Sequence, residues 1–114
     1  MLQALEPYLP AKDIPATAAF WQGTLGFDLT GQSEKWLRVA RDEVAVMFGQ
    51  GEPPQNFDGV LVVRATDVAA IADATDAAPE WGPRKTPDNR YEVAYRDPNG
   101  YLVNFTQNTK EGAA

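Results

Sequence analysis

The spacing of hydrophobic and polar positions changes along this chain, and the same change occurs twice. Residues 5–12 are typical of an opening strand, although Pro7 and Pro10 indicate an edge or irregular strand. Asp13 is a good N-cap for a helix that would end at Gly26. The apolar residues after this cap recur at helical spacing, at Ile14, Ala18, Trp21 and Leu25. The first stretch therefore predicts a strand followed by an amphipathic helix.

Three short strands are expected after this helix, at residues 27–30, 35–40 and 44–48. The segment 49–56 is rich in glycine and proline, so it is the natural linker between two halves. The pattern then starts again with a strand at residues 59–64. The first half is therefore expected to contain one strand, one helix and about three further strands.

A second helix is expected after the N-cap Asp67, with an apolar face formed by Val68, Ile71, Ala72 and Thr75. Residues 79–87 are loop-like and leave room for one short strand. A final hairpin is expected from residues 91–96 and 101–106, with a turn at Asp97-Pro98-Asn99-Gly100. The second half therefore repeats the order of the first.

The two halves also match in sequence. Residues 11–16 (Ala-Lys-Asp-Ile-Pro-Ala) correspond to residues 65–70 (Ala-Thr-Asp-Val-Ala-Ala), and residues 46–48 to residues 103–105. Strands joined by hairpins predict an α+β fold with a largely antiparallel sheet and helices on one face. We expect a single domain, 1–114, of two βαβββ modules: about 5–49 and 57–107, with a linker at 50–56.

Composition narrows the possible partners and cofactors. The chain of 114 residues has a formal charge of −6, so its field repels nucleic acid. It contains no cysteine and no histidine, which removes the commonest metal ligands and general bases. No apolar run reaches the roughly 20 residues that span a bilayer, and the N-terminus has no secretory pattern. We expect a cytoplasmic protein without nucleic-acid or membrane partners.

Three segments carry a resemblance to a known family: residues 13–21, residues 24–27 and the closing run 91–105. They resemble the vicinal-oxygen-chelate superfamily of glyoxalases, extradiol dioxygenases and bleomycin-resistance proteins, and look most like the bleomycin-resistance branch. The resemblance implies two βαβββ modules whose mostly antiparallel sheet curves around a cleft, with the helices on the convex face. It also implies a homodimer that completes the cleft.

Enzymes of this superfamily hold a divalent metal in the cleft, and the resemblance places their ligand positions at Glu6, Val60, Met47 and Asn104. A catalytic site needs about three oxygen, nitrogen or thiolate ligands. Here only Glu6 is a carboxylate and Asn104 a neutral amide. We therefore expect no metal and no other cofactor.

Alternation along the strands gives a candidate ligand-binding set. If Leu37 and Val39 face the helices, Trp36 faces the cleft, where it would stack on a planar or cationic ligand; a core or dimer contact is the competing interpretation. Glu6 is either a solvated carboxylate or a ligand contact. The full set is Glu6, Tyr8, Trp36, Arg38, Met47, Val60, Leu102 and Asn104, with Glu92 added from the resemblance.

The function expected from these features is binding of a small organic molecule without turnover. The expected ligand is a cationic or aromatic molecule of the antibiotic type. By sequestering it, the protein would confer antibiotic resistance. A metal-independent isomerase or lyase is the alternative, with Glu6 as acid/base and Tyr8 or Asn104 as its partner. A third interpretation is a closed cleft whose dimer surface binds another protein.

Overall fold

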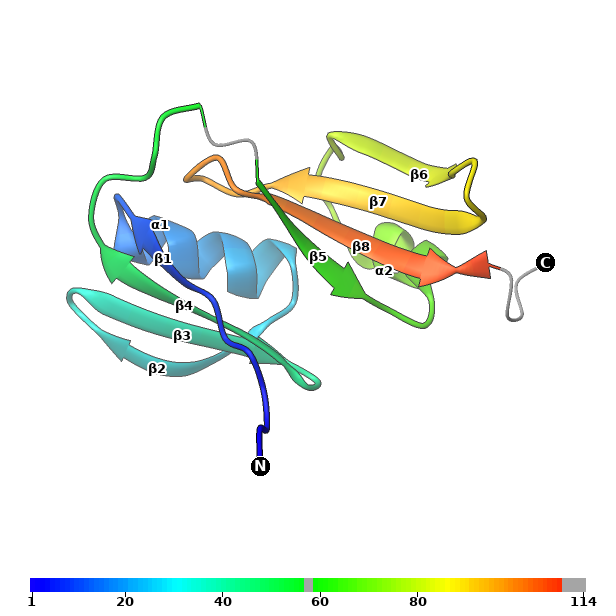
Figure 1. Cartoon of the computed structure of the whole chain (residues 1–114). Coiled ribbons are helices and arrows are strands. Elements are labelled where there is room, and N and C mark those ends of the chain that lie inside the picture. The colour runs from blue at the N-terminus through cyan, green and yellow to red at the C-terminus, as the bar shows by residue number, and fades with distance from the viewer. Residues whose placement is uncertain (57–58, 110–114) are drawn as a thin grey trace. The chain divides into compact units, whose positions relative to one another are not determined.

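The computed structural model describes residues 1–56 and 59–109 (Figure 1). The chain divides into two compact units between Asn56 and Phe57. Residues 57–58, where the second module was expected to begin, lie outside the described residues. No helix in the described part of the chain has the length and apolar character needed to cross a membrane.

The first unit contains a short helix, a wider helical segment of π type, and four strands. In chain order they are β1 (Tyr8–Ala11), α1 (Ile14–Ala19), η1 (Phe20–Thr24), β2 (Asp28–Ser33), β3 (Trp36–Arg41) and β4 (Val44–Gln50). The predicted helix is confirmed, and Gly26 follows it with a φ of 74°, a conformation that glycine adopts readily.

The second unit repeats this order without the π-helical segment. Its elements are β5 (Val60–Arg64), α2 (Val68–Ala74), β6 (Trp81–Lys85), β7 (Arg90–Arg96) and β8 (Leu102–Asn108). The strand for which residues 79–87 left room is therefore β6. The final hairpin turns at Asp97, whose carboxylate accepts hydrogen bonds from the backbone N–H groups of Asn99 and Tyr101, each at 2.9 Å.

Each unit has its own four-stranded sheet, in the order β1-β4-β3-β2 or β5-β8-β7-β6. The predicted α+β fold with two similar modules is confirmed. The sheets are mixed, because the first strand of each unit pairs in parallel with the last while the other pairs are antiparallel. The helix between the first two strands carries the chain across the sheet, which makes this parallel pairing possible.

The opening strand is shorter than expected. The prediction began it at residue 5, but β1 begins at Tyr8, and Leu5 is almost fully exposed. Before Tyr8 only the carbonyl of Pro7 joins the ladder, where it accepts a hydrogen bond of 2.9 Å from the N–H of Met47. Because proline has no N–H, Pro7 cannot extend the pairing further.

The core of each unit lies between its sheet and its helix. In the first unit the Trp21 side chain is fully buried, and its ring meets those of Phe27 and Phe48 at centroid distances of 5.0 and 5.5 Å. Leu37 and Val39 are also fully buried. In the second unit the buried core includes Val68, Val93, Tyr95, Val103 and Phe105. Alternate residues of the strands therefore face away from the helix.

Both helices begin at an aspartate whose side chain caps them. One carboxylate oxygen of Asp13 accepts from the N–H of Ala16 at 3.0 Å, and one of Asp67 accepts from the N–H of Ala70 at 3.1 Å. We expect Asp13→Ala and Asp67→Ala each to lower the free energy of unfolding by about 1 kcal/mol. Urea denaturation followed by circular dichroism measures this loss.

The control for these two variants is Asp73→Ala, which removes an exposed aspartate from within α2. It changes charge in the same way but removes no cap, and alanine favours a helix. Its stability should stay equal to or slightly above that of the unchanged protein. An equal loss in all three variants would mean that charge, not capping, causes the effect.

Candidate functional site

The face of the first sheet that points away from α1 carries most of the predicted site residues of this unit. Sheet register places Tyr8, Met47 and Arg38 side by side across three strands, and Trp36 opposite Gly49 in the next row. Leu37 and Val39, the neighbours of Trp36 and Arg38 along β3, are buried on the helix side. The strand therefore directs Trp36 and Arg38 to the open face.

Two aromatic rings of this face lie over glycines. The Trp36 ring covers Gly31, and the Tyr8 ring covers Gly49, so closely that a Cβ atom at either glycine would overlap the ring. Trp36 is half-buried, whereas Tyr8 is 60% exposed. The open face of the first sheet therefore presents flat ring surfaces beside polar groups, a combination found in small-molecule sites.

Glu6 and Arg38 form a bidentate ion pair on this face. Nε and Nη2 of Arg38 donate to the two carboxylate oxygens of Glu6, each at 3.0 Å, and Nη1 donates to the Thr30 hydroxyl at 3.0 Å. Hydrogen bonding from Arg38 lowers the pKa of Glu6 below its usual value, and the same bonds raise the pKa of Arg38. Glu6 therefore remains a carboxylate at neutral and mildly acidic pH.

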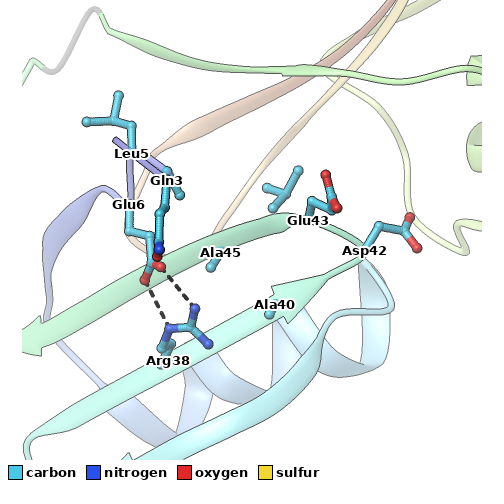
Figure 2. A pocket seen from close by; sticks show the side chains of 10 residues that line it. Gln3, Leu5, Glu6, Arg38, Ala40, Asp42, Glu43 and Ala45 are labelled. Atoms are coloured by element: carbon cyan, nitrogen blue, oxygen red, sulfur yellow. Dashed lines mark hydrogen bonds and ion pairs between the residues drawn. The ribbon is translucent and has the colours of Figure 1, made fainter. Parts of the chain in front are cut away.

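A pocket of about 500 Å³ adjoins this ion pair. Figure 2 shows Glu6 and Arg38 joined by two hydrogen bonds, with Asp42 and Glu43 farther along, at the turn between β3 and β4. The pocket is lined by Gln3, Ala4, Leu5, Glu6, Arg38, Ala40, Asp42, Glu43, Val44 and Ala45. Three carboxylates against one guanidinium leave this lining with an excess of negative charge.

The open face of the second sheet has a different chemistry. Register places Val62, Asn104, Ala94 and Trp81 in one row across four strands. Val60 lies opposite Leu102 in the row before it. The row after it contains Arg64, Thr106, Glu92 and Arg84. Val60, Leu102, Asn104 and Glu92 of the candidate set therefore share one face of this sheet.

Glu92 is the centre of a polar cluster on this second face. Its side chain is only 6% exposed, and Nε and Nη2 of Arg84 donate to one of its oxygens at 3.0 and 2.9 Å. The other oxygen accepts from Nδ2 of Asn104 at 3.3 Å and lies 3.9 Å from Nη2 of Arg90. A buried carboxylate is costly unless it is paired in this way.

Sequence reasoning missed Arg84, because it left residues 79–87 as mostly loop. The register of β6 against β7 is irregular between Trp81 and Arg84. Trp81 pairs with Ala94 and Arg84 pairs with Glu92, so three residue steps along β6 lie opposite only two along β7. The side chains of Trp81 and Arg84 consequently lie on the same face of the sheet, and the Arg84 guanidinium stands 5.2 Å from the centre of the Trp81 ring. The sequence signal was Gly82, whose φ of 80° is unfavourable for other residues.

A smaller pocket of about 330 Å³ lies in the second unit, lined by Val62, Arg64, Asp88, Arg90, Thr106 and Asn108. Arg90 bridges its polar groups, donating from Nε to Asp88 at 3.0 Å and from Nη1 to the Thr106 hydroxyl at 3.2 Å. Hydrogen bonds from Thr86 and Arg90 lower the pKa of Asp88. Two guanidiniums, Arg64 and Arg90, against the single carboxylate of Asp88 leave this lining with one positive charge in excess.

The four positions that the resemblance assigns to a metal do not fit one. Both oxygens of Glu6 bind the guanidinium of Arg38, Val60 has no donor atom, and Met47 offers only a thioether. Asn104 offers a single neutral amide oxygen. Across residues 1–56 and 59–109, no three aspartate, glutamate, histidine or cysteine residues lie close enough together to hold an ion.

The chain consists of two units with the same βαβββ order of elements, and each unit has an open sheet face and a pocket. This architecture defines a class of small proteins built from two similar modules. The sequence model of one such family, the Glyoxalase/Bleomycin resistance protein/Dioxygenase superfamily, matches residues 3–105. The chain belongs to this superfamily. No curated protein matches the chain significantly in sequence.

Solved structures of similar fold include antibiotic-binding proteins. A bleomycin-binding protein in complex with bleomycin aligns with a TM-score of 0.78 and 23% identity, over 94% of this chain and 99% of its own. TnmS3, an antibiotic binding protein from Streptomyces sp. CB03234, aligns at 0.77 and 24%, over 95% and 97%. The bleomycin-binding protein of bleomycin-producing Streptomyces verticillus, complexed with copper(II)-bleomycin, aligns at 0.67 and 28%, over 94% and 98%.

Proposed function

We propose that this protein binds a small organic molecule without chemical turnover, and that the pocket of its first unit receives a cationic, aromatic part of it. The observation that carries the proposal is the lining of that pocket, in which Glu6, Asp42 and Glu43 face a single cation, Arg38. The ring of Trp36 does not line this pocket, but it lies on the same sheet face in the row beyond Arg38, where a planar group that extends out of the pocket would stack on it.

Pairing within the pocket decides which carboxylates meet the ligand. Arg38 neutralises Glu6, whereas no ion pair with another described residue involves Asp42 or Glu43, and both are exposed. These two side chains are therefore the groups that attract a cation. The same pairing disfavours Glu6 as the general base of an isomerase or lyase, because it lowers the pKa of Glu6 and so weakens its basicity.

Similarity to bleomycin-binding and antibiotic-binding proteins supports binding rather than catalysis. Homodimer formation, sequestration as a resistance mechanism and a cytoplasmic location stay predictions. So do Tyr8 and Met47 as ligand contacts on the open face of the first sheet, and Val60 and Leu102 as ligand contacts on the open face of the second.

Isothermal titration with two matched probes tests this function. N-methylquinolinium is a planar cation, quinoline is its uncharged counterpart at neutral pH, and bleomycin serves as a larger probe. We expect N-methylquinolinium to bind more tightly than quinoline, with an advantage that shrinks as salt rises. Replacing Asp42 by Asn and Glu43 by Gln together should weaken its binding about fivefold to tenfold, since each exposed charge contributes modestly.

Two control variants separate the pocket from the general charge of the protein. Glu52→Gln removes an exposed carboxylate that does not line the pocket, so it should leave the affinity unchanged. Trp36→Ala should weaken both probes, because the stacking surface serves both. If none of the probes binds, or if Glu52→Gln weakens the cation as much as the pocket double variant does, the proposed function is wrong.

A further inference from the structure

We propose that the pocket of the second unit binds a monocarboxylate, which accepts hydrogen bonds from the Arg64 guanidinium and the Thr106 hydroxyl. All the residues that line this pocket of about 330 Å³ belong to the second unit. The proposal therefore goes beyond the proposed function and does not depend on the pocket of the first unit. The volume lies at the lower end of the range of about 300–1,000 Å³ that is typical of ligand pockets.

The pocket lies on the open face of the second sheet. Register pairs Arg64 of β5 with Thr106 of β8, and Asn108 of β8 with Arg90 of β7. Val62 lies two residues before Arg64 on β5, so alternation directs both side chains to the same face. Three adjacent strands therefore hold these five lining residues in fixed positions.

The Arg64 guanidinium carries the charge that this pocket leaves unpaired. Arg90 donates from Nε to Asp88 at 3.0 Å, so these two charges compensate each other. No ion pair with another described residue involves Arg64, whose side chain is exposed. A guanidinium presents parallel N–H groups that match the two oxygens of a carboxylate. The single positive charge in excess selects a single negative charge.

The Thr106 hydroxyl supplies a second donor beside Arg64. Thr106 is only 6% exposed, and its oxygen accepts a hydrogen bond of 3.2 Å from Nη1 of Arg90. The hydroxyl proton itself is donated to no described residue, although buried polar groups are usually satisfied. Because Thr106 lines the pocket opposite Arg64, one acceptor group bound there meets both donors.

These donors and charges distinguish a monocarboxylate from other polar groups. Arg64 and Thr106 both donate, so an ammonium, which cannot accept, forms no hydrogen bond with them. A neutral carboxamide brings no charge to the guanidinium. A phosphate dianion brings a second negative charge that the lining does not balance. Hydrogen bonds from Thr86 and Arg90 lower the pKa of Asp88, which therefore stays a carboxylate and repels a dianion.

Val62 indicates that the carboxylate belongs to a molecule with an apolar body. This valine is 60% exposed, lines the pocket and lies on the same sheet face as Arg64. An aromatic or aliphatic group bound against it would remove apolar surface from water, which favours binding. The expected ligand is therefore a small aromatic or aliphatic acid.

Benzoate and benzamide test this site, because they have nearly the same shape and differ in charge. They are titrated at millimolar concentration into ¹⁵N-labelled protein at about 0.15 M salt, which screens the repulsion of an anion by the net charge of −6. NMR follows the backbone N–H signals of Arg64 and Thr106. The indole N–H signal of Trp81, which does not line the pocket, is the internal control.

We expect benzoate to move the two backbone signals in a saturable way and to bind about fivefold to tenfold more tightly than benzamide, since only benzoate pairs with a charge. Arg64→Gln should remove this advantage by weakening benzoate about fivefold to tenfold. Lys85→Gln is the matched control, because it removes an exposed positive charge of the same unit that does not line the pocket. It should leave both affinities unchanged.

Two variants of Thr106 test the hydroxyl. Thr106→Val keeps the shape of the side chain but removes the donor, so it should weaken benzoate about threefold to tenfold. Thr106→Ser keeps the hydroxyl and should bind benzoate as the unchanged protein does. Equal weakening in both variants would contradict the role of the hydroxyl.

Equal affinity for benzoate and benzamide would overturn the proposal. An equal loss in Arg64→Gln and Lys85→Gln would also overturn it, because the general charge of the protein would then explain binding. So would tighter binding of phenyl phosphate, which is mostly a dianion at neutral pH. If a variant does not fold, the probes compared on the unchanged protein still decide. Arg64→Gln should leave N-methylquinolinium binding unchanged, so failure of the proposed function is seen separately.

Discussion

Replacing Trp21 by alanine should destabilise the first unit more than any other single truncation in it. The Trp21 side chain is fully buried against the rings of Phe27 and Phe48, at 5.0 and 5.5 Å between centroids. Such a truncation removes buried apolar surface and leaves a cavity, at a cost of about 3–5 kcal/mol. This is a large part of the about 5–15 kcal/mol that stabilises a typical domain.

The measurement is urea denaturation followed by far-ultraviolet circular dichroism, which does not depend on tryptophan emission. Trp36→Ala is the matched control, because it removes the same side chain from a half-buried position on the open sheet face. It should cost only about 1 kcal/mol, in proportion to the smaller area it buries. Equal losses in the two variants would contradict the assignment of Trp21 to the core and Trp36 to the open face.

Gly82→Ala should be the most damaging single-atom change in the second unit. A Cβ atom at Gly82 would overlap the backbone carbonyl oxygen of Glu92 and approach Cα of Val93 at 3.1 Å. The residue also has a φ of 80°, which costs a side-chain-bearing residue about 1–2 kcal/mol. With the displacement of β7 added, we expect a total loss of about 2–4 kcal/mol.

Gly100→Ala separates these two contributions. Gly100 has a φ of 93°, but a Cβ atom there would meet nothing within 4 Å. It should therefore show the backbone cost alone, about 1 kcal/mol. A Gly82→Ala variant no less stable than Gly100→Ala would show that β6 can move away from β7. Because Gly82 lies between Trp81 and Arg84, Gly82→Ala should also alter the indole signal of Trp81.

The order of elements was predictable because each depends on residues close together in sequence. The capping aspartates Asp13 and Asp67 and the apolar spacing after them fix both helices without reference to the rest of the chain. The face of each strand residue follows from alternation, which correctly put Leu37 and Val39 in the core. The internal repeat then supplied the pairing of elements into two modules.

Partners of individual side chains were not predictable, because they depend on register between distant strands. Nothing local indicates that Arg38 binds Glu6, 32 residues away. The irregularity between Trp81 and Arg84 was hidden for the same reason. It is visible only when β6 is paired with β7, and it reverses the face on which Arg84 would otherwise lie. Polar clusters therefore needed the structure, whereas the hydrophobic core did not.

The two sheets place different residues at matching points of their registers. Gly49 faces Trp36 in the first, and Thr106 faces Glu92 in the second. Duplication of one module, with both copies joined in one chain, would account for the common framework and for the divergence. Identical subunits must carry every substitution twice, but fused copies can change one at a time. One half of this molecule thereby carries a buried acid, Glu92, at the position where the other carries an indole, Trp36.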